Sequence, residues 1–528
     1  MLKKWFVLLM VLALFAGGCS SDSDSKGQDP SKPTGPSIGD YDFETEFTPE
    51  TLGLTPGATA TEINLNWYSD EITDPDEDAV KVLFWDGAND FKEVTGKVSA
   101  ASAGKSAHKA AVTGLKADTE YSYWVSNDGE SWSEEYKYRT PKTASFRFAS
   151  IGDPQLTLGN QDSTSELSSA DGTTAAGWLE TMEKVGLADV NFVAGVGDQV
   201  DVTSNGNEDE YRNFFAPSEL RSIPWAPAVG NHDRHYPFQY HYNIPNEQTF
   251  TKLQGADYSN NNDQYAEIEA AGNYWYRYNN ALFVVLNTSA YPTSKAAAEP
   301  IIKRFDDTLK AAKNGSPGYT WLFVQHHKST ASVADHIADR DIQYYVEAGF
   351  EELMTTHGVD FVLAGHDHVY ARSFPLTGKK DGTPSVPDTA QGGDAIANPN
   401  GTIYVTMTTG SGLKYYDLFN QSGNLYVKNN AAYPYLEGGA KGSVAYAGSN
   451  ILNWNNAAAA AAAGVVDAIT DPALWTKEIG VLPASNAVRF QDKKPAFTVV
   501  DVEGNKVTFN TYNIDDTVKS IDTFTVTK

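Results

Sequence analysis

The stretch Val359-Asp-Phe-Val-Leu-Ala-Gly-His-Asp-His368 decides how this sequence is interpreted. Its apolar part is typical of a buried strand, and it ends at Gly365, directly before His366 and His368. Side chains two positions apart on a strand point to the same side, so both imidazoles would reach one small space. Open α/β sheets bind ligands at the carboxyl ends of their strands. A single His-x-His pair is often a coincidence, so the interpretation depends on whether the pattern recurs.

The pattern recurs after four more apolar runs, at 146–151, 190–194, 227–230 and 321–324. Carboxylate, amide or imidazole side chains follow each run, and four of the five sites have a glycine immediately before a candidate ligand. Helical periodicity separates several of these runs, which predicts an α/β core whose strand ends share one edge. Oxygen donors mixed with imidazole, without thiolate, suit divalent zinc, manganese or iron. The polar residues in question are Asp153, Gln155, Asp198, Asp201, Asn231, His232, Asp233, His326 and His327.

The composition limits the kind of partner that the protein can have. The chain has 528 residues, and its 40 basic and 68 acidic side chains give a net charge of −28. Such a length predicts two or more domains. A nucleic-acid backbone is not expected as the main partner, because phosphates need lysine and arginine to neutralise them. If the substrate is an anion, metal ions are better suited than side chains to attract it.

The N-terminal residues predict export from the cytoplasm. Lys3 and Lys4 precede an apolar run over 5–16, and small residues then lead to Cys19, which is the only cysteine. This is typical of a signal peptide over 1–19, and its end resembles a bacterial lipoprotein signal with Cys19 as the lipidated residue. An ordinary signal peptide or a short membrane anchor are the alternatives, but the run is short for a membrane span. We expect an extracytoplasmic lipoprotein, on the cell surface or in the periplasm.

Three further regions follow this segment. Residues 20–47 are rich in Ser, Asp, Gly and Pro, which predicts a flexible linker. Residues 48–142 contain short alternating runs separated by turns, which predicts a small β-sandwich. Residues 143–528 form the α/β part, with an insertion at about 376–490 that contains an alanine-rich helix at 457–463. Alternating runs after residue 495 predict strands that return to the main sheet.

Taken together, the motifs resemble those of a known family. The ordered set from Asp153 to His368 is similar to the motifs of calcineurin-like metallophosphoesterases. The sandwich resembles a fibronectin type III-like domain, and more narrowly the domain that precedes the catalytic part of purple acid phosphatases. The resemblance implies a four-layer α/β/β/α fold, two metal ions (iron, zinc or manganese) and hydrolysis of a small phosphate ester.

The resemblance also implies individual roles. His232 would bind phosphate oxygens or protonate the leaving group, and Asp233 would orient it. The implied metal ligands are Asp153 and His368 for the first ion, Asp198 for both ions, and Asn231, His326 and His366 for the second. His241 and His336 are candidates for the substrate pocket, because they follow two of the motifs, and His327 is a third candidate.

Two positions depart from the family pattern, and one pair leaves a choice. Gln155 stands where most relatives have histidine, so only a neutral amide oxygen could reach the first metal. Asp201 stands where purple acid phosphatases have the tyrosine that gives their colour, so we expect a colourless or weakly coloured protein. In the pair His326-His327, the His-aromatic-Pro pattern favours His326 as the ligand, whereas the spacing from Val324 favours His327. We favour His326, because relatives with such a pair commonly use the first histidine.

Three functions fit these observations. A phosphomonoesterase is favoured. A phosphodiesterase or nucleotide hydrolase would use the same metal ions, because the metal core does not select the leaving group. A non-catalytic binding protein on the cell surface would keep the fold but not the chemistry, and the complete ligand set argues against it.

Overall fold

The computed structural model describes the two domains and parts of the segments around them. The predicted signal peptide, the first part of the linker and the alanine-rich helix at 457–463 lie outside the described residues. Among the helices that are described, none is long and apolar enough to cross a membrane. The described residues are 37–43, 47–73, 79–157, 175–201, 208–233, 236–250, 271–334, 336, 339–379, 385–412, 414–416, 443–446, 450–453 and 485–528.

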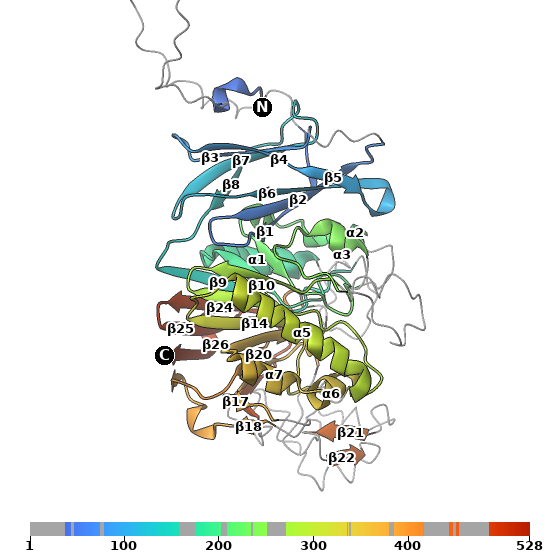
Figure 1. Cartoon of the computed structure of the whole chain (residues 1–528), viewed down its shortest axis with the longest axis vertical. Coiled ribbons are helices and arrows are strands. Elements are labelled where there is room, and N and C mark those ends of the chain that lie inside the picture. Colours follow the sequence, from blue (N-terminus) through green and yellow to red (C-terminus); the bar gives the residue numbers. More distant parts are fainter. Residues whose placement is uncertain are drawn as a thin grey trace, which may run out of the picture.

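The N-terminal domain is a β-sandwich, as predicted (Figure 1). Two antiparallel four-stranded sheets enclose an apolar core that includes Trp67, Tyr121 and Val125. One sheet has the order β1 (Glu50–Pro56), β2 (Ile63–Asp70), β6 (Lys105–Val112) and β5 (Lys97–Ala100). The other has the order β4 (Phe91–Thr95), β3 (Lys81–Trp85), β7 (Glu120–Ser126) and β8 (Tyr136–Arg139). The narrower resemblance to fibronectin type III domains stays a prediction.

The end of the predicted linker is packed against this sandwich. After a single 3₁₀ turn, η1 (Ile38–Asp40), the ring of Tyr41 lies 5.5 Å from that of Trp132. The ring of Phe43 lies 4.9 Å from that of Trp124. The prediction of a flexible linker up to residue 47 is therefore wrong for 37–43, because its aromatic side chains cover two tryptophans on the outer face of the sheet.

The second domain is built on two seven-stranded mixed sheets. Apolar side chains between the two sheets, such as Phe148, Phe283 and Phe509, form the central core. The first sheet has the order β11 (Trp225–Pro227), β10 (Phe192–Gly195), β9 (Ser145–Ile151), β24 (Ala496–Glu503), β25 (Lys506–Asn513), β26 (Asp516–Thr527) and β19 (Ala395–Ala397). The second has the order β12 (Tyr274–Tyr278), β13 (Ala281–Val285), β14 (Trp321–Lys328), β15 (Phe361–Gly365), β20 (Ile403–Thr406), β16 (Tyr370–Ser373) and β23 (Asn486–Phe490).

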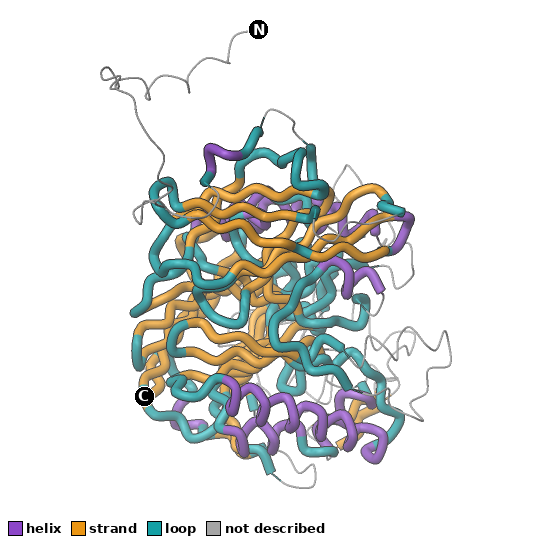
Figure 2. The backbone as a smooth tube through the Cα atoms, turned by 45° about the horizontal axis from the view of Figure 1, so that its top comes forward, coloured by secondary structure: helices purple, strands orange, loops and turns teal. Residues whose placement is uncertain are grey.

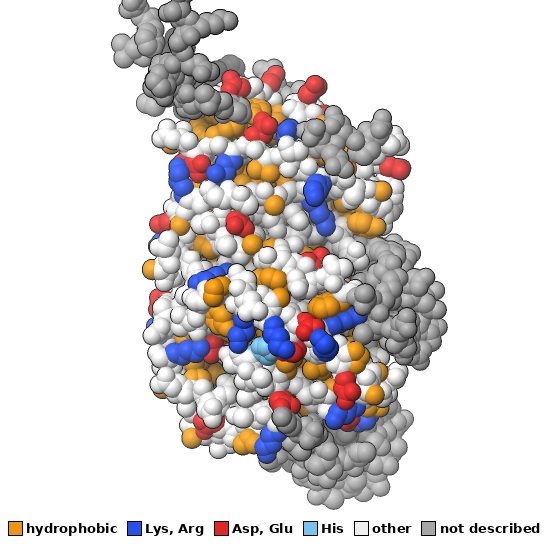
Figure 3. Space-filling view, viewed as in Figure 1, with side chains coloured by type: hydrophobic (Ala, Val, Ile, Leu, Met, Phe, Trp, Pro, Cys, Tyr) orange, Lys and Arg blue, Asp and Glu red, His pale blue; other side chains and the backbone are white. Residues whose placement is uncertain are grey.

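Helices cover the outer faces of both sheets, which confirms the predicted four-layer α/β/β/α arrangement (Figures 1 and 2). On the first sheet, α1 (Ala175–Leu187) buries Trp178 and Met182; α2 (Glu208–Phe214) and α3 (Tyr236–His241) lie near it. On the second sheet lie α5 (Lys295–Gly315), α6 (Arg340–Glu347) and α7 (Phe350–His357). On the face shown in Figure 3, lysine and arginine side chains are interspersed with acidic ones.

The predicted insertion at about 376–490 is too wide. Strand β20 lies between β15 and β16 in the second sheet, β23 forms its edge, and β19 pairs with β26 in the first sheet. These strands belong to the core. Among the described residues of this segment, only the hairpins β17 (Leu376–Thr377) with β18 (Val386–Pro387) and β21 (Ser443–Tyr446) with β22 (Asn450–Asn453) form separate small sheets. The C-terminal strands β24, β25 and β26 form the antiparallel meander that the sequence predicts.

Candidate metal centre and active site

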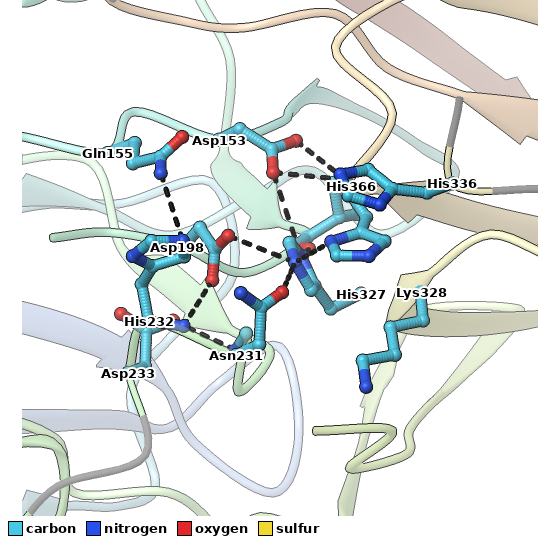
Figure 4. A network of polar contacts seen from close by, with 12 residues as sticks. Asp153, Gln155, Asp198, Asn231, His232, Asp233, His327, Lys328, His336 and His366 are labelled. Atoms are coloured by element: carbon cyan, nitrogen blue, oxygen red, sulfur yellow. Dashed lines mark hydrogen bonds and ion pairs between the residues drawn. The ribbon is translucent and has the colours of Figure 1, made fainter. Parts of the chain in front are cut away.

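The ends of five strands bring the predicted polar residues together (Figure 4). Parallel pairing places the carboxyl ends of β9, β10 and β11 side by side in one sheet, and those of β14 and β15 in the other. The two sheets meet at this edge: the backbone N–H of His366, after β15, donates to both carboxylate oxygens of Asp153, after β9, at 3.0 Å. The site is therefore built across the two sheets.

Glycines precede the ligands because the neighbouring strand end occupies the space of a side chain. A Cβ atom on Gly230 would lie 2.0 Å from Oδ1 of Asp198, and one on Gly365 would lie 2.4 Å from Oδ2 of Asp153. A Cβ on Gly197 would lie 2.5 Å from Nδ1 of His327. The recurring glycine in the sequence motifs thus has a steric cause.

The backbone of the site is in an unusual conformation. Five of its non-glycine residues have positive φ angles: 46° at Asp153, 44° at Gln155, 51° at Asp198, 72° at His366 and 45° at His368. Residues other than glycine seldom adopt this region, and each instance costs on the order of 1–3 kcal/mol unless the surroundings enforce it. The strand ends hold these turns in place, and strain gathered at one point of a fold is typical of a functional site.

One donor group surrounds Asp198. Nε2 of His327 lies 3.1 Å from Oδ2 of Asp198, 3.0 Å from Oδ1 of Asn231 and 3.1 Å from Nδ1 of His366. Nδ1 of His327 is 2.8 Å from the carbonyl of Val196, to which it can donate a hydrogen bond. The lone pair of Nε2 is then directed at the candidate metal-ligand atoms of Asp198, Asn231 and His366. Asp198, His327 and His366 are close enough together to share one metal ion.

His327, and not His326, belongs to this group, so the preference for His326 as the ligand is corrected. The ring of His326 is fully buried and lies 4.9 Å from that of Phe350, on the helix-covered face of the sheet. Neither of its ring nitrogens has a hydrogen-bond partner among the described residues, and burial lowers its pKa to about 3. His326 is therefore a neutral core residue.

A second donor group surrounds Asp153. Nδ1 of His368 is 2.7 Å from the carbonyl of Lys414, so the Nε2 lone pair of His368 can face Oδ1 of Asp153, 3.4 Å away. Two acceptors in this position repel each other unless a cation lies between them. The buried Oε1 of Gln155 has no hydrogen-bond partner in the described part of the chain. A carboxylate, an imidazole and an unpaired amide oxygen fit a hard or borderline divalent ion.

The electrostatic field at Asp198 favours positive charge. Burial alone would raise the pKa of Asp198, but His327 and His232 outweigh this effect and lower it. Conversely, burial alone would lower the pKa of His327, but the carboxylates of Asp198 and Asp153 raise it to about 9. The same field that attracts a proton to His327 would attract a metal ion.

His232 is oriented by Asp201, so the prediction that Asp233 orients it is wrong. Nδ1 of His232 contacts the backbone carbonyl of Asp201, and the side-chain amide of Gln155 lies 3.2 Å from Nε2. The same amide donates to Oδ1 of Asp201 at 2.9 Å. The imidazole is about a quarter exposed, so it can reach a molecule bound in the site.

Asp233 has a different task. It is fully buried and accepts hydrogen bonds of 2.9 Å from the backbone N–H groups of Gln199 and Gly230. Burial and the nearby Asp198 carboxylate raise its pKa to about 8. Asp233 thus joins the loop that carries Asp198 to the loop that carries Asn231, and it acts on the site through those loops.

Of the three candidates for the substrate pocket, His327 belongs to the group around Asp198, and the other two lie in different places. The ring of His336 stacks on His366 with 3.9 Å between ring centroids, next to the hydroxyl of Tyr416 and to Asp339. His241 instead contacts Glu208 and stacks on Tyr68 of the sandwich, so the prediction that it lines the pocket is wrong. Sequence reasoning missed Tyr416 and Asp339, because neither belongs to one of the strand-end motifs.

Comparison with known proteins identifies both domains. Residues 49–140 match the family described as purple acid phosphatase, N-terminal domain, and residues 146–370 match the calcineurin-like phosphoesterases. Together the two matches cover more than half of the chain. The second domain therefore belongs to the calcineurin-like phosphoesterases, and the first to the purple acid phosphatase N-terminal domains.

Individual relatives of this phosphoesterase are distant. Uncharacterized proteins from two strains of Mycobacterium tuberculosis, CDC 1551 and H37Rv, are 24% identical to it over 320 residues. The alignment spans 57% of this chain and 57% of each mycobacterial protein. Purple acid phosphatase PPD1 from yellow lupin (Lupinus luteus) seeds has a similar fold, with a TM-score of 0.58 and 14% identity over 92% of this chain and 75% of the plant protein. Purple acid phosphatases use a dinuclear metal centre, and Asp198, His327 and His366 are candidate metal ligands in this chain.

Proposed function

We propose that this phosphoesterase is a metal-dependent phosphomonoesterase. The observation that carries the proposal is the convergence of Oδ2 of Asp198, Nε2 of His327 and Nδ1 of His366, with Nε2 about 3.1 Å from each of the other two atoms. Two imidazoles and a carboxylate that converge in this way are a donor set that suits a divalent ion. Two divalent ions beside two carboxylates would leave a net positive site on a protein of charge −28, and such a site attracts a phosphate group.

The residues of the site divide into ligands and groups that face the substrate. Asp153, Gln155 and His368 would hold one ion, Asn231, His327 and His366 the other, and Asp198 would contact both. When bound, a pair of ions supplies a hydroxide nucleophile at neutral pH and stabilises both ends of the displacement at phosphorus. His326 is left out of both sets, because its ring is buried against Phe350.

His232 and His336 are the groups that would meet the substrate. With Nδ1 directed at the carbonyl of Asp201, Nε2 of His232, which lies 3.2 Å from the amide nitrogen of Gln155, is the atom that would exchange a proton with the leaving-group oxygen. His336 lies over the ring of His366 and is partly exposed, and a phosphate oxygen would take the place of the Tyr416 hydroxyl, 3.0 Å from its Nε2. General acid catalysis of this kind typically contributes about 10²- to 10⁴-fold to the rate.

We also propose that the protein acts outside the cytoplasm and is attached to the membrane by a lipid on Cys19. It is supported by the signal-like sequence over 1–19. The variant Cys19→Ser, expressed in a bacterial host, is expected to move from the membrane fraction to the soluble fraction. A wild-type protein recovered entirely in the soluble cytoplasm would contradict this part of the proposal.

A pair of substrates tests the reaction itself. With added manganese or zinc, purified protein is expected to hydrolyse p-nitrophenyl phosphate faster than bis-p-nitrophenyl phosphate, and Asp198→Ala is expected to lose both activity and bound metal. Faster hydrolysis of the diester would indicate a phosphodiesterase. Hydrolysis of neither compound by metal-loaded protein would indicate a binding protein.

A further inference from the structure

The β-sandwich contacts the catalytic domain at the segments that follow two loops of the active site. Helix α3 begins at Tyr236, four positions after His232, and packs against β2 and η2 (Ser102–Gly104). Helix α2 begins at Glu208, seven positions after Asp201, and packs against β1. His232 and Asp201, whose backbone carbonyl contacts Nδ1 of the His232 ring, therefore both lie close in sequence to the domain interface.

Lys109 of β6 terminates α3 from outside the catalytic domain. Its Nζ donates to the carbonyls of Gln239 and Tyr242, each at 2.6 Å. The last carbonyls of a helix have no partner within the helix, and a cation is favourable at this end. A helix of six residues has little stability of its own, so this cap determines where α3 ends. Burial lowers the pKa of Lys109 to about 8, which indicates how far the ammonium group is withdrawn from water.

Further hydrogen bonds extend this contact beyond the helix. The carbonyl of Asn243 accepts from Nδ2 of Asn64 and from Oγ1 of Thr55, both at 2.7 Å. In return, Nδ2 of Asn243 donates to the carbonyl of Ala110 at 2.8 Å. The chain after the catalytic loop is thus bound to three strands of one sheet of the sandwich.

The second contact joins α2 to α3 through the sandwich. Glu208, the first residue of α2, accepts from the hydroxyls of Ser102 and Tyr68, the latter at 3.2 Å. Its other oxygen lies 2.6 Å from Nε2 of His241, the last residue of α3. The ring of His241 stacks on Tyr68 at 4.2 Å and is fully buried. These contacts fix the two helices relative to each other and to the sandwich.

We infer that the β-sandwich is a positioning element of the active site, and that Lys109 is the residue through which it holds the His232 loop. The inference rests on the proposed function for its catalytic consequence. It gives the N-terminal domain a role in the reaction without direct contact with the substrate. The rigid sandwich, held by its own core, restricts both α3 and α2 and so keeps the imidazole at the distance from the metal ligands that proton transfer needs.

The test uses the full-length, metal-loaded protein and three lysine variants. Lys109→Met removes the ammonium group and keeps most of the aliphatic stem, and Lys109→Arg restores a donor. Lys97→Met is the matched control, because Lys97 is the exposed cross-strand neighbour of Lys109 on β5. We expect Lys109→Met to lower kcat for phenyl phosphate about tenfold and that for p-nitrophenyl phosphate, a better leaving group, by less than about twofold. Bound metal is expected to stay constant, and Lys109→Arg should recover most of the activity.

Hydrogen exchange of the backbone supplies a readout that does not depend on activity. Lys109→Met is expected to increase exchange over 236–243, whereas Lys97→Met is not. If Lys109→Met does not fold, Asn64→Ala, which removes one interdomain hydrogen bond, is expected to change both readouts in the same direction by a smaller amount. Equal exchange and equal substrate ratios in the variants and the control would overturn the inference. If wild-type protein hydrolyses neither ester, the proposed function fails, and the exchange measurement still decides whether Lys109 holds α3.

Discussion

Substitution of Gly230 by alanine is expected to inactivate the enzyme although it adds a single methyl group. The new Cβ atom would lie 2.0 Å from Oδ1 and 2.2 Å from the backbone nitrogen of Asp198. Cβ atoms essentially never approach other heavy atoms closer than 3.0 Å, so the two loops must move apart by about 1 Å. Gly230 also donates to Asp233, so the separation stretches the hydrogen bonds that join these loops.

The magnitude follows from that displacement. A shift of about 1 Å in a reacting group typically costs about 10²-fold in rate. The side chains of Asp198 and Asn231, which are both candidate metal ligands, would be displaced. We therefore expect kcat/KM for p-nitrophenyl phosphate to fall by about 10²-fold or more. Overpacking of this kind costs on the order of 1–3 kcal/mol in stability, which a folded domain of this size can tolerate.

Three measurements test this expectation: kcat/KM, bound metal per chain and the urea concentration at half-unfolding. Gly393→Ala is the control, because Gly393 is exposed and a Cβ atom there meets nothing within 4 Å. Gly365→Ala, whose Cβ would lie 2.4 Å from Oδ2 of Asp153, should disturb the first metal instead. A Gly230→Ala protein with wild-type kcat/KM and full metal content would refute the steric account of the motif.

Four other predictions follow from the site. His327→Leu should lose bound metal, whereas His326→Leu should retain it and be neutral or slightly stabilising, since both ring nitrogens of His326 lack partners; equal metal loss in both would contradict the assignment. Gln155→His should raise metal retention during dialysis, and unchanged stoichiometry would remove Gln155 from the ligand set. The melting temperature of the metal-free protein should fall as the pH rises from about 6.5 to 9. The pKa of His327 is raised to about 9 in the folded protein, so its stabilising proton is lost over that range. The metal-loaded protein should not show this fall. Purified protein should lack a strong visible absorption band, because Asp201 replaces the tyrosine, and a purple preparation would exclude this assignment.

The ends of the strands were predictable from the sequence, because most of the apolar runs stop at a recognisable turn residue. Apolar runs that stop at glycine and then a carboxylate or imidazole gave Asp153, Asp198 and His366 in positions that converge in the structure. The parallel pairing that brings them together follows from strands separated by helices. These features depend on local sequence and on general rules of sheet topology.

The choice between His326 and His327 could not be made from the sequence, because it depends on strand register. Adjacent residues on a strand point to opposite faces, so one histidine had to enter the site and the other the helix-covered core. The pairing of β14 with β15 shifts between Gln325 and Lys328, next to the histidines. A bulge of this kind changes the face of the sheet on which a side chain lies, and no residue type in the segment predicts it.

The partners of His232 and His241 were missed for a different reason. Asp233 is the nearest acid to His232 in sequence, but its oxygens are already occupied by two backbone N–H groups. The contact with Asp201 joins separate loops and appears only in three dimensions. His241 follows the catalytic loop in sequence, yet the turn of α3 directs it to Tyr68 in the other domain. Contacts between domains leave no periodic trace in either sequence segment.

Gln155 links the two halves of the site through a single amide group. Its oxygen is buried without a hydrogen-bond partner among the described residues and is the atom available to the first metal ion. Its nitrogen donates to Asp201 and lies 3.2 Å from Nε2 of His232. An amide can present an acceptor to a cation and donors to two other groups at the same time, which neither a carboxylate nor a neutral imidazole can do. On the proposed function, glutamine in place of the family histidine would lower the affinity for the first metal ion and fix the position of His232, the residue that would meet the leaving group.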